Sequence, residues 1–205
     1  MSPAKLMLSP KELELVNDPG WILTKNAIIE KVYGLFGELS RSYDGKLLRT
    51  DLIGKDNAGF RSPKIAKGEQ YENLPWVMLD HPRCFDGENV LAIRSFFWWG
   101  NFCSISLFLS GKYRQQYEAA VQQYFSAGAT GSNNRHNWFI CVKEDPWQHH
   151  FREDNYQPMS EWGNQSFGSL PFIKLGKKIS LQEWDNLNDF FEENYSEILK
   201  MLTAG

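Results

Sequence analysis

The stretch VLAIRSFFWWGNFCSISLFLS, residues 90–110, decides the fold because it predicts a β-hairpin near the centre of the chain. Gly100 and Asn101 both tolerate a positive φ and suit a two-residue turn. In the resulting register Arg94 shares one side of the sheet with the most apolar residues of both arms. These residues are Ala92, Phe96, Trp98, Cys103, Ile105, Leu107 and Leu109. We therefore expect Arg94 on the drier face of the sheet.

Four segments around the hairpin show helical spacing of apolar residues or a helix-capping pattern. Ser9 precedes a proline and a glutamate in the order that opens a helix, and Pro19-Gly20 would then stop it. Ser180 begins a second such capping box. The predicted helices cover residues 10–17, 24–43, 112–125 and 181–202.

Further strands are predicted at residues 76–80, 137–142 and 172–179, the first of them closed by a turn at His81-Pro82-Arg83. Two long connections remain, residues 44–75 and 143–170. The first is either a functional loop or contains strands that show no clear period, and the second is too aromatic for a mere spacer. The pattern predicts an α+β fold with a mainly antiparallel sheet, centred on the 90–110 hairpin and packed against about four helices.

Composition limits the classes of function. A length of 205 residues favours one domain over residues 1–205, with a loosely ordered segment 1–8. A net charge of -3 does not favour nucleic-acid binding. The sequence shows no signal peptide and no membrane-spanning segment, and its three cysteines follow no metal-binding spacing. We therefore expect a cytoplasmic protein that uses no metal or other cofactor.

Aromatic residues make up 15% of the chain and include 8 Trp, which indicates a well-filled core, an aromatic binding surface, or both. Arg94 stands out among them, because a guanidinium on an apolar sheet face needs a partner to offset its desolvation. One interpretation is a buried ion pair, for which Asp80 is the first candidate, or stacking on a neighbouring ring. The alternative is a pocket that binds an anion.

Asp80, His81 and Arg83 place a carboxylate, an imidazole and a guanidinium at the end of one strand. Asp80 and His81 are therefore the candidates for acid-base catalysis, although the backbone requirements of a turn explain the same residues. His149 and His150 are adjacent, a spacing that does not let both imidazoles bind one metal ion. A metal site would need His81 together with one of this pair.

The leading hypothesis is a non-catalytic domain that binds a protein partner or a small anionic ligand through the hairpin and the long connections. Its candidate ligand-binding residues are Arg94, Arg83, His149, Tyr156 and Trp162. One alternative is an enzyme that uses an Asp/His/Arg pocket on a small anionic substrate, formed by Asp80, His81 and Arg94 with His149 or Tyr156 as a further member. It requires Asp80, His81, Arg83 and Arg94 to line one cavity. A second alternative is a homodimer formed through the aromatic face.

Overall fold

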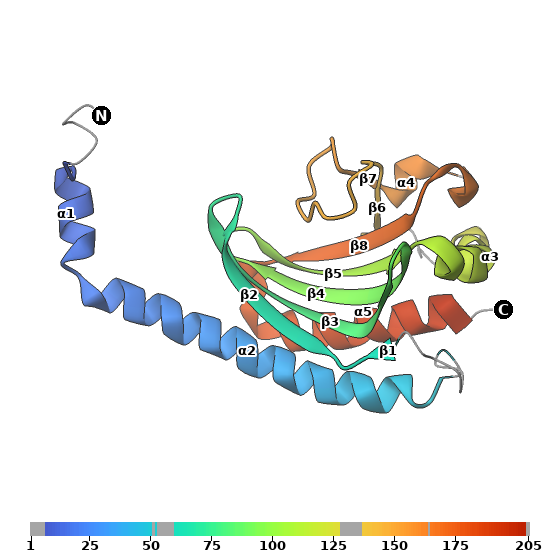
Figure 1. Ribbon diagram of the computed structural model, residues 1–205, viewed down its shortest axis with the longest axis horizontal. Coiled ribbons are helices and arrows are strands. Elements are labelled where there is room, and N and C mark those ends of the chain that lie inside the picture. The colour runs from blue at the N-terminus through green and yellow to red at the C-terminus, as the bar shows by residue number, and fades with distance from the viewer. Residues whose placement is uncertain (1–6, 51, 53–59, 128–136, 164, 204–205) are drawn as a thin grey trace.

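The computed structural model describes residues 7–50, 52, 60–127, 137–163 and 165–203. These residues form helices and one large antiparallel sheet (Figure 1), the α+β class that the sequence predicts. The α-helices are α1 (Pro10–Val16), α2 (Pro19–Leu47), α3 (Gly111–Ala127), α4 (Met159–Trp162) and α5 (Leu187–Thr203). The strands are β1 (Phe60–Arg61), β2 (Lys64–Tyr71), β3 (Leu74–Asp86), β4 (Asn89–Trp98), β5 (Phe102–Leu109), β6 (Phe139–Cys141), β7 (Tyr156–Pro158) and β8 (Ile173–Ser180). Two short 3-10 helices are η3 (Phe167–Ser169) and η4 (Leu181–Asn186).

The strand order across the sheet is β1, β3, β4, β5, β8, β6, β7, and β2 pairs with the first half of β3. Helices α2 and α5 pack against one face, which we call the helix face. The opposite face carries the connection between β6 and β7, residues 142–155, which we call the roof loop. We call this second face the groove face, because the cavities described below lie on it.

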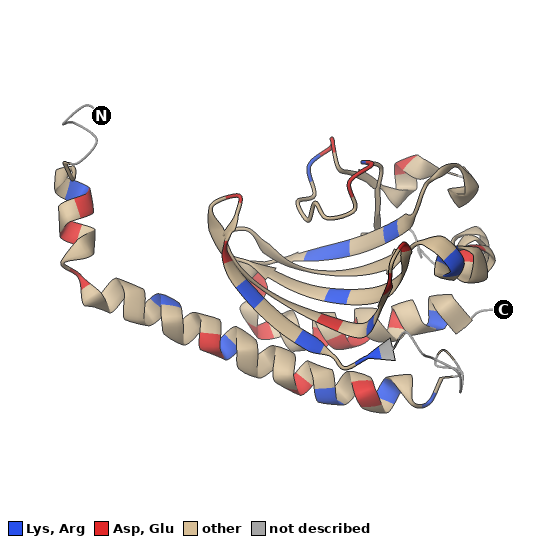
Figure 2. Ribbon diagram, viewed as in Figure 1, with Lys and Arg blue, Asp and Glu red and all other residues tan. Residues whose placement is uncertain are grey.

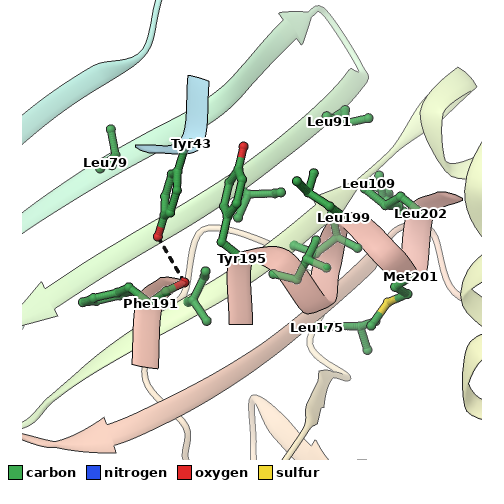
Figure 3. Close-up of a cluster of buried hydrophobic side chains, with 14 of the residues drawn as sticks. Tyr43, Leu79, Leu91, Leu109, Leu175, Phe191, Tyr195, Leu199, Met201 and Leu202 are labelled. Atoms are coloured by element: carbon green, nitrogen blue, oxygen red, sulfur yellow. Dashed lines mark hydrogen bonds between the residues drawn. The ribbon is translucent and has the colours of Figure 1, made fainter. Parts of the chain in front are cut away.

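The main core lies between the helix face and the two helices. Its strand residues alternate with those of the groove face, as the two-residue period of a strand requires. Figure 3 shows part of this core, in which side chains of α5 pack against leucines of several strands. Tyr43 of α2 stacks on Tyr195 of α5 at a centroid distance of 3.6 Å, and its hydroxyl donates to the carbonyl of Phe191 at 3.3 Å. This contact joins the two helices under the centre of the sheet.

The hairpin register differs by one residue from the predicted one. Trp98 pairs with Phe102, so the loop holds three residues, with Gly100 at a φ of 70°. Arg94 consequently lies opposite Ser106. Because a one-residue slip exchanges the two faces of a strand, the prediction that Arg94 shares a face with the apolar residues of the second arm is wrong. Those residues, which face the helices, are Cys103, Ile105, Leu107 and Leu109.

Three further boundaries differ from the predictions. Pro19 opens α2 instead of ending α1, because Asp18 supplies an N-cap and proline is favoured in the first helical turn. The connection 44–75 contains the end of α2 and the strands β1 and β2, so the second of its two interpretations holds for its described part. His81 and Pro82 form no turn. They lie inside β3 at a register shift, and the strand continues to Asp86.

Most of the large apolar side chains that are exposed in the described chain lie between Met7 and Leu23. Helix α1 has no buried residue, and the first buried residue of α2 is Ile29. Figure 1 shows α1 and the beginning of α2 extending away from the sheet. None of the described helices is both long enough and apolar enough to cross a membrane.

Candidate functional site

The groove face carries an aromatic cavity of about 500 Å³. Its walls come from β2, β3 and β4 on the sheet side and from the roof loop on the other side. The side chains that line it are Glu69, Gln70, Tyr71, Trp76, Met78, Phe96, Trp147 and His149. Phe96, on the sheet side of the cavity, is almost fully buried. Trp147, on the side of the roof loop, remains 49% exposed, so this wall of the cavity is accessible to solvent.

Gly68 gives this cavity its shape. A Cβ atom at position 68 would lie 2.7 Å from the indole ring of Trp76, so only glycine allows the ring to lie across β2 in this position. The Trp76 ring also stacks on Phe96, with centroids 6.3 Å apart and planes 30° from parallel. The groove therefore has a flat aromatic floor whose orientation is fixed by neighbouring strands.

Tyr71 fastens the roof loop to the sheet. Its hydroxyl oxygen accepts hydrogen bonds from the backbone N–H groups of His149, at 2.7 Å, and of His150, at 3.0 Å. Arg152 of the loop forms an ion pair with Glu72 in the β2–β3 turn. These contacts join residues that lie about 80 positions apart in the sequence, so the loop is held over the sheet from one side.

Lys174 of β8 holds the loop from the other side. Its buried ammonium donates to the carbonyl oxygens of Pro146 and Gln148, each at 2.6 Å. Burial lowers the pKa of Lys174 to about 7, and the charge of Arg94 acts in the same direction. The Asp145 carboxylate accepts from the backbone N–H of Trp147 at 2.9 Å. Together these contacts fix Trp147 as one wall of the aromatic cavity.

The predicted partnership of Arg94 with Asp80 is confirmed. The guanidinium donates to both oxygens of the Asp80 carboxylate, through Nε at 2.7 Å and Nη2 at 2.9 Å. Nη1 lies 3.2 Å from Nε2 of His149, and the Trp147 ring lies 5.8 Å from the guanidinium carbon. In Figure 2 a basic segment of β4 lies beside an acidic segment of the neighbouring strand β3. The pair is largely buried, with side-chain exposures of 12% and 9%.

His149 is neutral in this arrangement. A guanidinium can only donate, so Nε2 of His149 accepts the hydrogen bond from Arg94 and the ring carries its proton on Nδ1. Burial, followed by the charges of Lys174 and Arg94, holds the pKa of His149 well below its ordinary value. The ring also packs against Phe96 at a centroid distance of 4.9 Å. His149 thus supplies an aromatic wall and a fixed acceptor for Arg94.

A second cavity of about 350 Å³ adjoins the aromatic one, and Trp76 and Met78 line both. Its charged lining consists of Lys64, Asp80, Arg83 and Arg94. Asp80 and Arg83 reach the same face although they are three residues apart, because the register shift at His81 and Pro82 adds one residue to β3. We use the word groove for the two adjoining cavities together.

The remaining predicted site residues lie elsewhere. His81 points toward the helix face, where Nε2 lies 2.8 Å from an Asp44 oxygen and Nδ1 lies 3.4 Å from the Tyr195 hydroxyl. Tyr156 is buried, stacked on Phe151 beneath the roof loop, and Trp162 is buried in the main core. Arg83, Arg94 and His149 therefore line the groove, whereas His81, Tyr156 and Trp162 do not. Of the four residues that the enzyme alternative requires in one cavity, Asp80, Arg83 and Arg94 line the second cavity, and His81 does not.

Sequence reasoning missed several residues that build the groove: Gly68, Tyr71, Trp76, Met78, Trp147 and Lys174. The run of aromatic and charged residues in 143–170 was a sign of a site, but no local pattern placed it over β3 and β4. Among the described residues, no group of three or more His, Cys, Asp and Glu side chains is arranged to hold a metal ion. A scan against models of protein families, a search of curated proteins and a search of solved structures each gave no match.

Proposed function

We propose that this protein binds a small molecule with a flat apolar body in the groove between the sheet and the roof loop. The observation that carries the proposal is the aromatic cavity of about 500 Å³, whose volume is typical of small-molecule sites. Aromatic walls from Trp76, Phe96 and Trp147 favour a flat ligand, because stacked or edge-on rings give contacts beyond simple burial of area.

The fixed walls also support the proposal. The roof loop is anchored from two sides. Tyr71 accepts hydrogen bonds from two backbone N–H groups of the loop, and Lys174 donates hydrogen bonds to two of its carbonyl oxygens. A site whose walls are ordered before binding loses little conformational entropy when a ligand enters. About half of Trp147 is exposed to water. Exposed apolar surface of this kind often marks a binding site, and a ligand in the cavity would cover it.

Binding of an uncharged bicyclic aromatic compound, 2-naphthol, tests the proposal. Saturation-transfer NMR detects binding, and isothermal titration calorimetry gives the affinity. We expect 2-naphthol to bind the natural protein and to bind Trp147→Ala about tenfold more weakly, since the substitution removes one wall of the cavity. Gly68→Ala should weaken binding as well, because the new methyl group displaces the Trp76 ring.

Trp184→Ala is the matched control. Trp184 is also an exposed tryptophan, 37% accessible, but it packs against Phe97 on the helix face and lies outside the groove. This variant should bind 2-naphthol as the natural protein does. Absence of binding to the natural protein, or equal affinities in Trp147→Ala, Gly68→Ala and Trp184→Ala, would contradict the proposal.

A further inference from the structure

The second cavity of the groove carries more positive than negative charge. Asp80 is the acidic side chain that lines it, and both of its carboxylate oxygens are engaged by Arg94. Arg83 and Lys64 line the same cavity, and neither forms an ion pair or a side-chain hydrogen bond with any residue that the structure describes. Two cations therefore face this cavity without a described counterion.

Arg61 adds a third cation. It lies directly opposite Arg83 in the register of β1 and β3, so the two side chains project from the same face. Like charges in directly opposite positions of an antiparallel pair destabilise the sheet. An anion bound between the two guanidinium groups would attract both of them and offset their repulsion. The described residues place no anionic group at this position.

The placement of Arg83 suits recognition of an oxyanion. Its side chain is partly buried in the lining of the second cavity, and the register shift at His81 and Pro82 directs it to the groove face. A guanidinium can donate two parallel hydrogen bonds to a carboxylate or a phosphate. Trp76 and Met78 line both cavities, so an oxyanion near Arg83 and an apolar body on the aromatic floor lie next to each other.

We infer that the ligand of the groove carries an oxyanion, a carboxylate or a phosphate, which is bound by Arg83 with the support of Lys64 and Arg61. The inference rests on the proposed function, since the apolar body of the same ligand occupies the aromatic cavity. Arg94 has a different role. Its ion pair with Asp80 and its contact with His149 leave it as a fixed part of the lining of the second cavity.

Three probes with one naphthalene body separate the possibilities: uncharged 2-naphthol, 2-naphthoate and 2-naphthyl phosphate. Calorimetric titrations at low salt should show one or both anions binding at least about tenfold more tightly than 2-naphthol. The anion that gains more affinity identifies the source of the oxyanion as a carboxylate or a phosphate. Added salt should reduce the advantage of the anions and leave 2-naphthol unaffected.

Arg83→Gln and Lys64→Gln test the residues. Arg83→Gln should remove most of the advantage of the anions, Lys64→Gln should remove part of it, and both variants should keep the natural affinity for 2-naphthol. That retained affinity shows that the aromatic cavity is still folded. Lys67→Gln is the matched control, because Lys67 lies on the same strand as Lys64 but on the helix face, over the Tyr33 ring.

The two proposals fail in different ways. Failure of all three probes to bind would overturn the proposed function together with this inference. Binding of 2-naphthol with no gain for either anion would overturn only the inference, and so would an anion advantage that persists unchanged in both Arg83→Gln and Lys64→Gln.

Discussion

Asp80 and Arg94 lie directly opposite each other on β3 and β4, and the guanidinium donates to both carboxylate oxygens at 2.7 and 2.9 Å. This largely buried pair lines the cationic half of the groove together with Arg83. Through Arg94 it also contacts His149 and Trp147, which wall the aromatic half. Its charges compensate each other, so the excess of positive charge in the groove comes from residues around the pair. The pair thus joins the charged lining of one half of the groove to the aromatic wall of the other.

Arg94→Met leaves the Asp80 carboxylate buried without its partner. We expect this variant to lose about 3–5 kcal/mol of unfolding free energy, because an uncompensated buried charge costs far more than the net gain from an intact pair. Urea unfolding at neutral pH measures the loss. The double variant Asp80→Leu/Arg94→Met should recover most of it, since it removes both charges together. Equal stabilities of Arg94→Met and the natural protein would show that the pair is not buried as described.

The lowered pKa of Lys174 predicts that the free energy of unfolding depends on pH above about pH 7. The pKa of Lys174 is about 7 in the folded protein and about 10.4 in an unfolded chain. Between these values the unfolded chain binds a proton that the folded protein does not, so Lys174 contributes a free energy of unfolding that rises with pH from about 7 to 10. Burial raises the pKa of the three cysteines, which acts in the opposite direction above about pH 8.5, so the contribution is clearest between about pH 7 and 8.5. Lys174→Met should remove this contribution and loosen the roof loop. Lys178→Met, an exposed lysine on the same face of β8, is the control and should leave the slope as in the natural protein.

The lowered pKa of His149 predicts that the free energy of unfolding decreases in acid. Burial holds the pKa of His149 well below its ordinary value, so below about pH 6.5 the unfolded chain takes up a proton before the folded one does. The free energy of unfolding should therefore fall as the pH decreases from about 6.5, and His149→Gln, which keeps an acceptor for Arg94, should reduce this fall. Nitrogen-15 NMR of the ring should show Nδ1 protonated and Nε2 unprotonated at about pH 6. A doubly protonated ring at that pH would contradict the account.

Removal of residues 1–17 should leave the folded body intact. Helix α1 has no buried residue, and burial in α2 begins at Ile29, so the truncation removes little buried apolar surface. We expect the melting temperature to change by less than about 2 °C. Truncation after Leu199 is the contrasting variant, because it removes the buried Met201 and Leu202 and should cost several degrees. A large loss with the first truncation would show that the N-terminal segment packs more closely than described.

The sequence predicted the elements of the central sheet better than their register. Helical spacing and capping patterns located α1, α3 and the core of α2, and the hairpin was found at residues 90–110. Choosing a two-residue turn placed Arg94 on the wrong face. The composition of β5 held the missing signal: its serines, Ser104 and Ser106, alternate with a set of fully apolar residues. Matching that apolar set to the core would have put Arg94 opposite Ser106.

The site was less predictable because it depends on contacts between distant segments. Arg83 and Arg94 were identified from their residue types, and the ion pair with Asp80 followed from the expected neighbourhood of two strands. Trp147 and Lys174 reach the groove only because the roof loop folds back over β3 and β4, and no local pattern specifies that path. The register shift at His81 and Pro82 cannot be read from the alternation of residues along a strand, although it places Arg83 on the same face as Asp80. His81, as the neighbour of Asp80, points to the opposite face.

Binding in the groove can be observed directly by following the indole N–H signals of the 8 Trp residues during a titration with 2-naphthoate. We expect saturable shifts of the Trp76 and Trp147 signals, because these rings line the groove, with the signals of Trp21 and Trp184 unchanged. Assignment by single Trp→Phe variants identifies each signal. Shifts confined to Trp21 or Trp184, or no saturable shift of Trp76 and Trp147, would contradict ligand binding in the groove.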